Sequence, residues 1–128
     1  MILDLNIAEA EELSVLPEGE HLLSIKRADV EDRKNKEGQM IHLVCESVND
    51  KLTKDVHHYL LFPTAADDEK QKQQRLFGIK KFCDATQVSC TPLNTDDFTG
   101  RQFWAILTID DNPEHGRSNK IKTLVSAK

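Results

Sequence analysis

The sequence predicts a single, mainly β domain: a five-stranded barrel with one α-helix between its third and fourth strands. Five segments carry apolar residues at strand spacing, and one longer segment carries them at helical spacing. The 128 residues are enough for one hydrophobic core. No segment repeats another. We therefore expect one domain over residues 1–128, with an acidic N-terminal arm at 1–17 and the barrel at 18–126.

Turn residues such as glycine, proline and asparagine separate the expected strands. In the first strand the apolar positions change phase between Ile25 and Ala28, which is typical of a β-bulge in a long, bent strand. The fourth strand is the clearest, because Phe103, Ala105 and Leu107 recur with a period of two. The expected strands cover residues 21–30, 39–47, 56–62, 102–109 and 119–125.

A helix is expected over residues 65–85, between the third and fourth strands. Thr64 is a suitable N-cap, and Asp67 three residues later resembles a capping box. A short helical turn is also expected at residues 95–98. The apolar stripe of the long helix, spaced to face the sheet, consists of Leu76, Ile79, Phe82 and Cys83.

The element order is therefore three strands, a helix and two further strands. This is the order of the OB-fold, a five-stranded, partly open Greek-key barrel. Other small mixed folds share this order, so the order alone leaves the topology open. OB-folds bind oligonucleotides on strands 2 and 3 and on the loops that flank them.

The net charge of −5 is distributed unevenly. Residues 1–20 contain six acids and no Lys or Arg, whereas the rest of the chain has 16 of the 22 acids and all 17 basic residues. A near-neutral body can carry a basic groove, since phosphate binding depends on local Lys and Arg placement. The alternative is a charge balance that only aids solubility. An amphipathic turn is expected within the arm, on Ile7, Ala10, Leu13 and Leu16.

Composition also bears on location. No apolar run approaches the ~20 residues needed to span a bilayer, and the first residues lack the pattern of a secretory signal. Three irregularly spaced cysteines predict neither a disulfide framework nor a zinc clamp. We expect a cytoplasmic protein without membrane contact and without a cofactor. The oligomeric state stays open between monomer and homodimer.

Several segments resemble a bacteriophage family of single-stranded DNA-binding proteins, once catalogued only as a domain of unknown function. The likeness runs from about residue 3 to residue 126, and its specificity lies in the order of short motifs. It implies an OB-like fold, a role in DNA replication or recombination, and the cytoplasm of an infected bacterium. The chain departs from many phage single-strand binders, since Val125-Ser126-Ala127-Lys128 is not an acidic tail. The matching segments are Leu16-Pro17-Glu18-Gly19-Glu20-His21, Glu37-Gly38 with Met40-Ile41-His42-Leu43, Phe77-Gly78-Ile79, Asp97-Phe98-Thr99-Gly100-Arg101-Gln102-Phe103 and Asn119-Lys120-Ile121.

Basic residues in three places are candidates for contacts with DNA phosphates. One group lies in the loop between the first two strands, where OB-folds contact their ligand; an ordinary solvated hairpin tip is the alternative. The other two groups lie on the first and last strands, with a plain solvent face as the alternative. The candidates are Arg33, Lys34 and Lys36 in the loop, Lys26 and Arg27 on the first strand, and Lys120 and Lys122 on the last.

Aromatic side chains could stack on bases without regard to sequence. Tyr59 and Trp104 are the only Tyr and Trp. If Val56, His58 and Leu60 point inward, His57 and Tyr59 point outward, and Trp104 lies opposite the inward set of its own strand. Packing of Trp104 under the helix or the arm is the alternative, and a one-residue slip would exchange His57 with His58.

Neither catalysis nor a metal site is expected. Adjacent His57 and His58 on a strand point to opposite faces and cannot share an ion with His42 or Cys45 without a bulge. Asp110 and Asp111 fit turn chemistry as well as a nuclease cation site, and no phosphate-loop, nucleophile-elbow or zinc-protease motif occurs. The sequence favours a sequence-independent binder of single-stranded DNA, not an enzyme. The alternative is a protein-binding OB-like adaptor for replication or recombination proteins.

Overall fold

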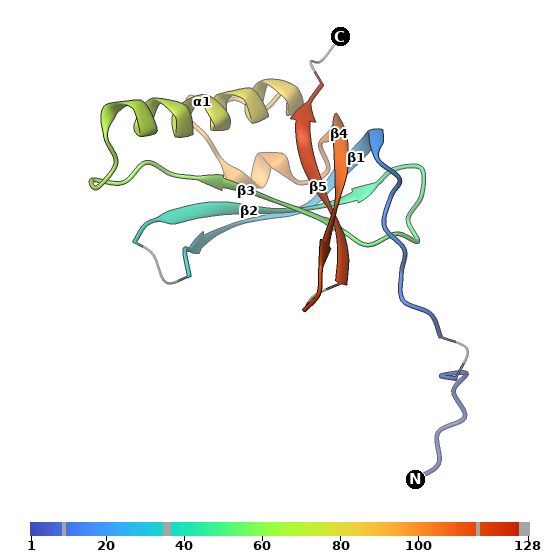
Figure 1. Cartoon of the computed structure of the whole chain (residues 1–128). Coiled ribbons are helices and arrows are strands. Elements are labelled where there is room, and N and C mark those ends of the chain that lie inside the picture. The colour runs from blue at the N-terminus through green and yellow to red at the C-terminus, as the bar shows by residue number, and fades with distance from the viewer. Residues whose placement is uncertain (9, 35–36, 115, 126–128) are drawn as a thin grey trace.

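Five antiparallel strands form one sheet, and one long helix packs against it (Figure 1). The computed structural model describes residues 1–8, 10–34, 37–114 and 116–125; Lys36, Ser126, Ala127 and Lys128, named above, lie outside them. The strand order in the sheet is β3-β2-β1-β4-β5. The elements are β1 (Gly19–Asp32), β2 (Gln39–Ser47), β3 (Val56–Leu61), α1 (Glu69–Thr86), a 3-10 helix (Thr95–Phe98), β4 (Gln102–Asn112) and β5 (Gly116–Leu124).

The central strand β1 pairs with two neighbours along different parts of its length. Its first part, residues 19–24, pairs with β4, and its later part, residues 23–32, pairs with β2. The register with β2 shifts between Ile25 and Arg27. This confirms the expected β-bulge. The bulge increases the local twist of β1, so that its two halves can pair with different neighbouring strands.

The sheet is open. Strands β3 and β5 are its two edges, and they approach each other in space. Among the described residues no ladder of hydrogen bonds joins them. The mainly β chain with five strands and one helix is therefore confirmed, but the expected barrel is not closed, because the pairing stops at these two edges.

The hydrophobic core lies between one face of the sheet and α1. Phe103, Ala105 and Leu107 of β4 are buried there, as their period of two predicts. Phe82 of α1 is fully buried, with its ring centroid 5.2 Å from that of Phe103 and 5.5 Å from that of Phe98. The 3-10 helix expected at residues 95–98 is thus present, and it closes the core beside α1.

The helix begins later than the sequence predicts. Asp68, not Thr64, is its N-cap, and it forms a capping box with Gln71. Thr64 and Asp67 instead close a turn, in which the Thr64 N–H donates to the Asp67 carboxylate (2.8 Å) and the Asp67 N–H donates to the Thr64 carbonyl (3.1 Å). The expected stripe is also partly wrong, since Leu76 is half exposed.

The arm meets the body only near its end. Leu16 is buried, and its N–H and C=O pair with the Asn119 side chain at 2.8 and 2.9 Å. Just before it, the Ser14 carbonyl accepts from the Lys54 N–H (2.8 Å). Within the expected amphipathic turn the Ala10 N–H donates to the Ile7 carbonyl (3.0 Å), and Leu16 is the one apolar side chain of the four that is buried, since Ile7, Ala10 and Leu13 stay exposed.

Candidate nucleic-acid interface

The face of the sheet that turns away from the core, called the outer face below, carries most of the predicted site. Cross-strand pairing sets His42 of β2 beside Tyr59 of β3, and Val44 beside His57. Paired residues share a sheet face. His57 and Tyr59 therefore point outward, as the sequence predicts, while Val56 and Leu60 are buried in the core.

Three rings gather on β2 and β3, at one end of this face. The rings of His42 and Tyr59 are stacked, with centroids 4.7 Å apart and planes 19° apart. The His57 ring lies on the other side of His42, at 5.0 Å. Tyr59 is 47% exposed, so its ring is supported by His42 and still accessible. A supported, exposed ring is what base stacking requires.

Hydrogen bonds fix the two imidazoles. His42 Nδ1 lies 2.8 Å from Glu31 Oε2, and His42 Nε2 lies 2.8 Å from His57 Nδ1. A carboxylate only accepts, so His42 Nδ1 carries a proton. When both rings are neutral, His57 Nδ1 must then donate to His42 Nε2. The Glu31 carboxylate thus orients both rings through one chain of hydrogen bonds.

The charge of His57 is suppressed. Burial lowers the pKa of His57, and the nearby His42 lowers it further, with Arg27 acting in the same direction and Asp55 opposing. The folded protein therefore disfavours a charged His57 near neutral pH. At that pH the ring contributes its flat surface and not a positive charge.

The predicted cations fall into two classes. Lys26 and Arg27 on β1 are neutralised by acids, with Lys26 Nζ 3.1 Å from Asp55 and Arg27 Nε 2.9 Å from Asp29. Exposed pairs of this kind are weak, but they cancel most of the local positive field. Arg33 and Lys34 form no ion pair with another residue in the described part of the chain.

Arg33 and Lys34 border the same surface as the rings. Together with Met40, His42, Tyr59 and Leu61 they line an open groove of about 550 Å³. Two acids, Glu31 and Asp32, also line it. The groove therefore brings two cations to an exposed phenol ring, neither of them ion-paired within the part of the chain that the structure describes. The third predicted loop cation, Lys36, lies outside the described residues.

Gly38 sets the position of this loop. The Arg33 N–H donates to the Gly38 carbonyl (3.0 Å), which closes the hairpin. Gly38 has φ +116°, and a Cβ there would lie 2.7 Å from Thr64 Cγ2. Only glycine fits this conformation and this close approach. The loop therefore lies tightly against the segment that follows β3.

Trp104 lies elsewhere on the outer face. It is 45% exposed, as predicted, and pairs across the sheet with Leu22 of β1. His42 pairs with Asp29, seven residues further along β1, which corresponds to about 20 Å of strand. The structure thus separates Trp104 from Tyr59, and one continuous stack of the two rings is excluded.

The predicted cations of β5 accompany Trp104 and not Tyr59. Lys120 pairs with Thr108 of β4, on the outer face of that strand, and its Nζ lies 3.8 Å from Asp110. Lys122 is exposed and lies at the register shift between β4 and β5. Lys120 and Lys122 would therefore contact a different stretch of a bound ligand from the one that lies at Tyr59.

No protein-family model matches this chain, and neither does any curated protein. Within the described ranges, no helix is both long enough and apolar enough to span a bilayer.

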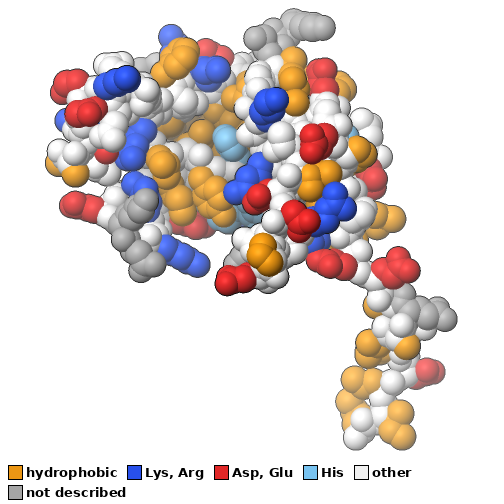
Figure 2. Space-filling view, viewed as in Figure 1, with side chains coloured by type: hydrophobic (Ala, Val, Ile, Leu, Met, Phe, Trp, Pro, Cys, Tyr) orange, Lys and Arg blue, Asp and Glu red, His pale blue; other side chains and the backbone are white. Residues whose placement is uncertain are grey.

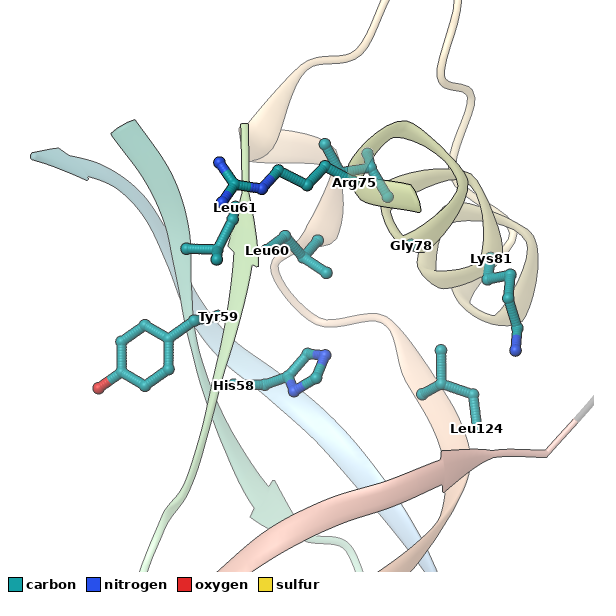
Figure 3. Close-up of a pocket in the computed structure, with 9 residues that line it drawn as sticks. His58, Tyr59, Leu60, Leu61, Arg75, Gly78, Lys81 and Leu124 are labelled. Carbon is teal, nitrogen blue, oxygen red and sulfur yellow. The ribbon is translucent and has the colours of Figure 1, made fainter. Parts of the chain in front are cut away.

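His58 belongs to the opposite side of β3. Figure 3 shows its ring pointing toward Leu124 and α1, while Tyr59 points away on the other side of the strand. The His58 ring stacks on Phe82 at 5.5 Å, and burial lowers the pKa of His58 to about 4. In the part of the chain that the structure describes, no three His, Cys, Asp or Glu side chains gather to hold a metal ion.

Two features of the surface were missed from the sequence. His42 is absent from the predicted DNA-binding residues, although its alternation with Ile41 and Leu43 already puts it on the outer face. The helix α1 also exposes charge: its side chains Lys70, Lys72, Lys80 and Lys81 form no ion pair with another described residue. Helical spacing alone does not say which lysines lack acidic partners on other elements.

Proposed function

We propose that this protein binds single-stranded DNA without regard to sequence. The observation that carries the proposal is the exposed Tyr59 ring, stacked on His42 and bordered by Arg33 and Lys34, which have no ion-pair partner among the described residues. A base stacks on Tyr59 while the neighbouring phosphates contact the loop cations. Every base has a flat face, so this mode does not select a sequence.

The energetics of this mode set its strength. Stacking contributes ~1–3 kcal/mol per base, and each phosphate contact on a single strand changes the slope of log K against log salt by about 0.7. Acids neutralise Lys26 and Arg27, so few contacts release counterions. We expect stacking to supply most of the affinity, with a shallow dependence on salt.

The finer topology is part of the proposal. A central strand shared by β2 and β4, with edges β3 and β5 close together, suits a partly open, OB-like Greek-key barrel. OB-folds bind single strands on strands 2 and 3 and on the adjoining loop. Tyr59, His42, Arg33 and Lys34 occupy the corresponding elements. The resemblance to phage single-strand binders supports the same reading, with a role in DNA replication or recombination inside an infected bacterial cell.

A titration of labelled oligo-dT tests the proposal. Fluorescence anisotropy in about 50 mM salt should rise to saturation, and duplex DNA of equal length should bind more weakly, because its bases are not free to stack. Mixed-sequence single strands should bind as oligo-dT does. Absence of binding to any single strand under these conditions would remove the proposal.

One observation favours a second function, that of a protein-binding adaptor. The arm exposes Ile2, Leu3 and Leu5 beside acidic side chains, which suits contact with a basic, apolar surface of a partner protein. The two functions separate in the same titration. An adaptor would show no affinity for oligo-dT, whereas the DNA binder keeps its affinity when the arm is removed.

A further inference from the structure

The middle of α1 is strongly basic, although the chain as a whole has a net charge of −5. Residues 70–83 contain four Lys and one Arg, and no Asp or Glu. The guanidinium of Arg75 already serves the fold, because it lies 2.9 Å from the Asp67 carboxylate and donates to the Phe62 carbonyl (3.2 Å). The four lysines have no ion-pair partner among the described residues. Their charge is therefore available to an anionic ligand.

A phenylalanine ring lies exposed among these lysines. Phe77 is 59% exposed, and Lys81 Nζ lies 5.8 Å from the centre of its ring. Ile79 packs in the core and lies about 200° further around the helix, so Phe77 points to solvent. Lys80 and Lys81, three and four residues after Phe77, lie on the same side of the helix. An exposed ring beside lysines is the combination that binds single strands.

Gly78 leaves open space next to this ring. It lies in the middle of α1, where glycine is less favourable than alanine. Its φ is not positive, and a Cβ there would meet nothing within 4 Å among the described residues. The fold therefore does not require glycine at this position. A glycine also lets the backbone of a ligand approach closely, and the open space at Gly78 suits a ligand that passes over the helix.

A groove between β3 and α1, called the helix groove below, connects Gly78 with the Tyr59 site. It measures about 270 Å³, and both Gly78 and Lys81 line it (Figure 3). Tyr59 and Leu61 line this groove as well as the larger groove of the outer face. No acidic residue is among the described residues that line the helix groove. Figure 2 shows a hollow with hydrophobic and histidine side chains, bordered by Lys and Arg side chains.

We propose that the single strand bound at Tyr59 continues through the helix groove and over α1. A further base stacks on Phe77, and the phosphates on either side of it contact Lys80 and Lys81. This inference rests on the proposed function, since it extends the path of the same ligand. The strand needs no backbone group of the β3 edge, which β5 already approaches, and no contact with Arg75.

Two observations favour a nucleic acid over an acidic peptide as the ligand of α1. The two grooves share Tyr59 and Leu61, so one continuous strand reaches both. Exposed rings also lie at both ends of this path, at Tyr59 and Phe77. A single strand supplies a base for each ring and a phosphate for each neighbouring cation.

Oligo-dT of two lengths tests this path by fluorescence anisotropy. A strand of about 5 nucleotides stays at Tyr59, whereas one of about 20 also reaches α1, since one OB-fold covers ~4–16 nucleotides. We expect Phe77→Ala to weaken binding of the long strand by about fivefold and to leave the short strand nearly unaffected. The matched control is Leu76→Ala. Leu76 is also half exposed, but it lies about 200° from Gly78 around the helix, so both affinities should stay unchanged.

A charge reversal on each side of α1 adds an independent readout. Lys81→Glu should reduce the slope of log K against log salt by about 0.7 for the long strand. Lys72→Glu makes the same change in net charge, but Lys72 lies about 140° from Phe77 around the helix. It should therefore leave the slope of the long strand nearly as it is in the wild type. If both variants reduce the slope equally, the lysines act only through net charge, which overturns the path over α1.

Gly78→Gln guards against loss of binding through loss of fold. Glutamine favours a helix more than glycine does, and the space around Gly78 is open. We therefore expect the melting temperature to rise, while affinity for the long strand falls because the new side chain lies in its path. A variant that becomes more stable and still binds the long strand less tightly supports the proposal.

The outcomes separate this inference from the proposed function. If the wild type binds neither length, both are overturned. If the wild type binds both lengths but Phe77→Ala and Gly78→Gln bind the long strand normally, only the path over α1 is overturned. Equal losses for the two lengths in Phe77→Ala also overturn it. If Phe77→Ala keeps its DNA affinity but loses affinity for a labelled peptide of Asp and Phe residues, the surface belongs to an acidic protein partner and the proposal is wrong.

Discussion

Each end of the outer face presents one large exposed aromatic ring, but the side chains that surround the two rings differ. At one end Tyr59 rests on His42, next to His57 and to Arg33 and Lys34, for which the described ranges contain no ion-pair partner. At the other end Trp104 lies opposite Leu22 of β1. The two rings are almost equally exposed, at 47% and 45%. Their exposure alone would rank them as equal sites.

The difference shows that an exposed ring is not by itself a binding site. The Tyr59 ring is held in place by a stacked imidazole, which Glu31 orients in turn. A ring held before binding loses less conformational freedom when a base stacks on it. Free cations must also lie within reach of the phosphates, and Arg33 and Lys34 line the Tyr59 groove. We expect the Tyr59 end to dominate the binding.

The largest expected effect comes from replacing Tyr59 or Trp104 by alanine, in two separate variants. Tyr59→Ala should weaken oligo-dT binding by roughly tenfold or more, since stacking contributes ~1–3 kcal/mol per base. Trp104→Ala should change it by less than about twofold. Anisotropy titrations of both variants against the wild type measure the difference.

Tyr59→Phe is the control for the ring itself. It keeps the flat surface and should keep most of the affinity, whereas loss of affinity in Tyr59→Phe would assign the effect to the hydroxyl. If Trp104→Ala proves the more damaging alanine variant, the ranking of the two ends is reversed.

A smaller effect is expected from reversing one lysine at each end. Lys34→Glu removes an unpaired cation beside Tyr59 and should weaken binding by about fivefold at low salt. It should also reduce the salt slope by about 0.7. Lys122→Glu makes the same change in net charge at the Trp104 end and should leave the slope nearly unaltered. Equal slopes in the two variants would show that only the overall charge matters.

The smallest expected effect is a strengthening of binding in mild acid. The folded protein holds the pKa of His57 below its ordinary value through burial and the neighbouring His42. A bound phosphate favours the charged imidazole, so binding takes up protons and the affinity rises as pH falls. Between about pH 7.5 and 5.5 we expect a gain of less than about fivefold.

His57→Phe should flatten this pH profile, while His21→Gln, on the Trp104 half of β1, should not. A pH profile of binding that His57→Phe leaves unchanged would show that the His57 imidazole does not cause the gain in affinity.

The binding measurements stay above pH 5.5 because folding itself becomes pH-dependent below that value, through His58. Burial lowers the pKa of His58 to about 4. The unfolded chain binds a proton there at an ordinary pKa of about 6.5, so stability falls as pH drops from about 6.5 toward 4.

Much of the fold could be predicted because it follows from local periodicity. The period of two in β4 correctly assigned Phe103, Ala105 and Leu107 to the core, and the phase change after Ile25 correctly located the bulge in β1. The helix start was wrong by one turn, because Thr64 and Asp67 pair with each other in a turn and leave Asp68 as the cap. Thr64 and Asp68 both carry a side-chain oxygen that can cap a helix, so either start of α1 agrees with the same capping chemistry.

The site was less predictable, since it depends on contacts between strands. Alternation placed Tyr59 and Trp104 on the outer face, but only the register of β1 with β2 and β4 reveals how far apart they are. The acids that neutralise Lys26 and Arg27 are likewise visible only once Asp55 and Asp29 are positioned. Positive charge counted along the sequence therefore overestimated the cationic surface.

Photochemical cross-linking tests the central claim most directly. An oligo-dT in which iodouracil replaces thymine can be irradiated in complex with the wild-type chain, and the cross-linked peptides identified by mass spectrometry. We predict cross-links within β3 and β2, at Tyr59, His57 or His42. Cross-links confined to Trp104, a ring that reacts readily in such experiments, would contradict the account.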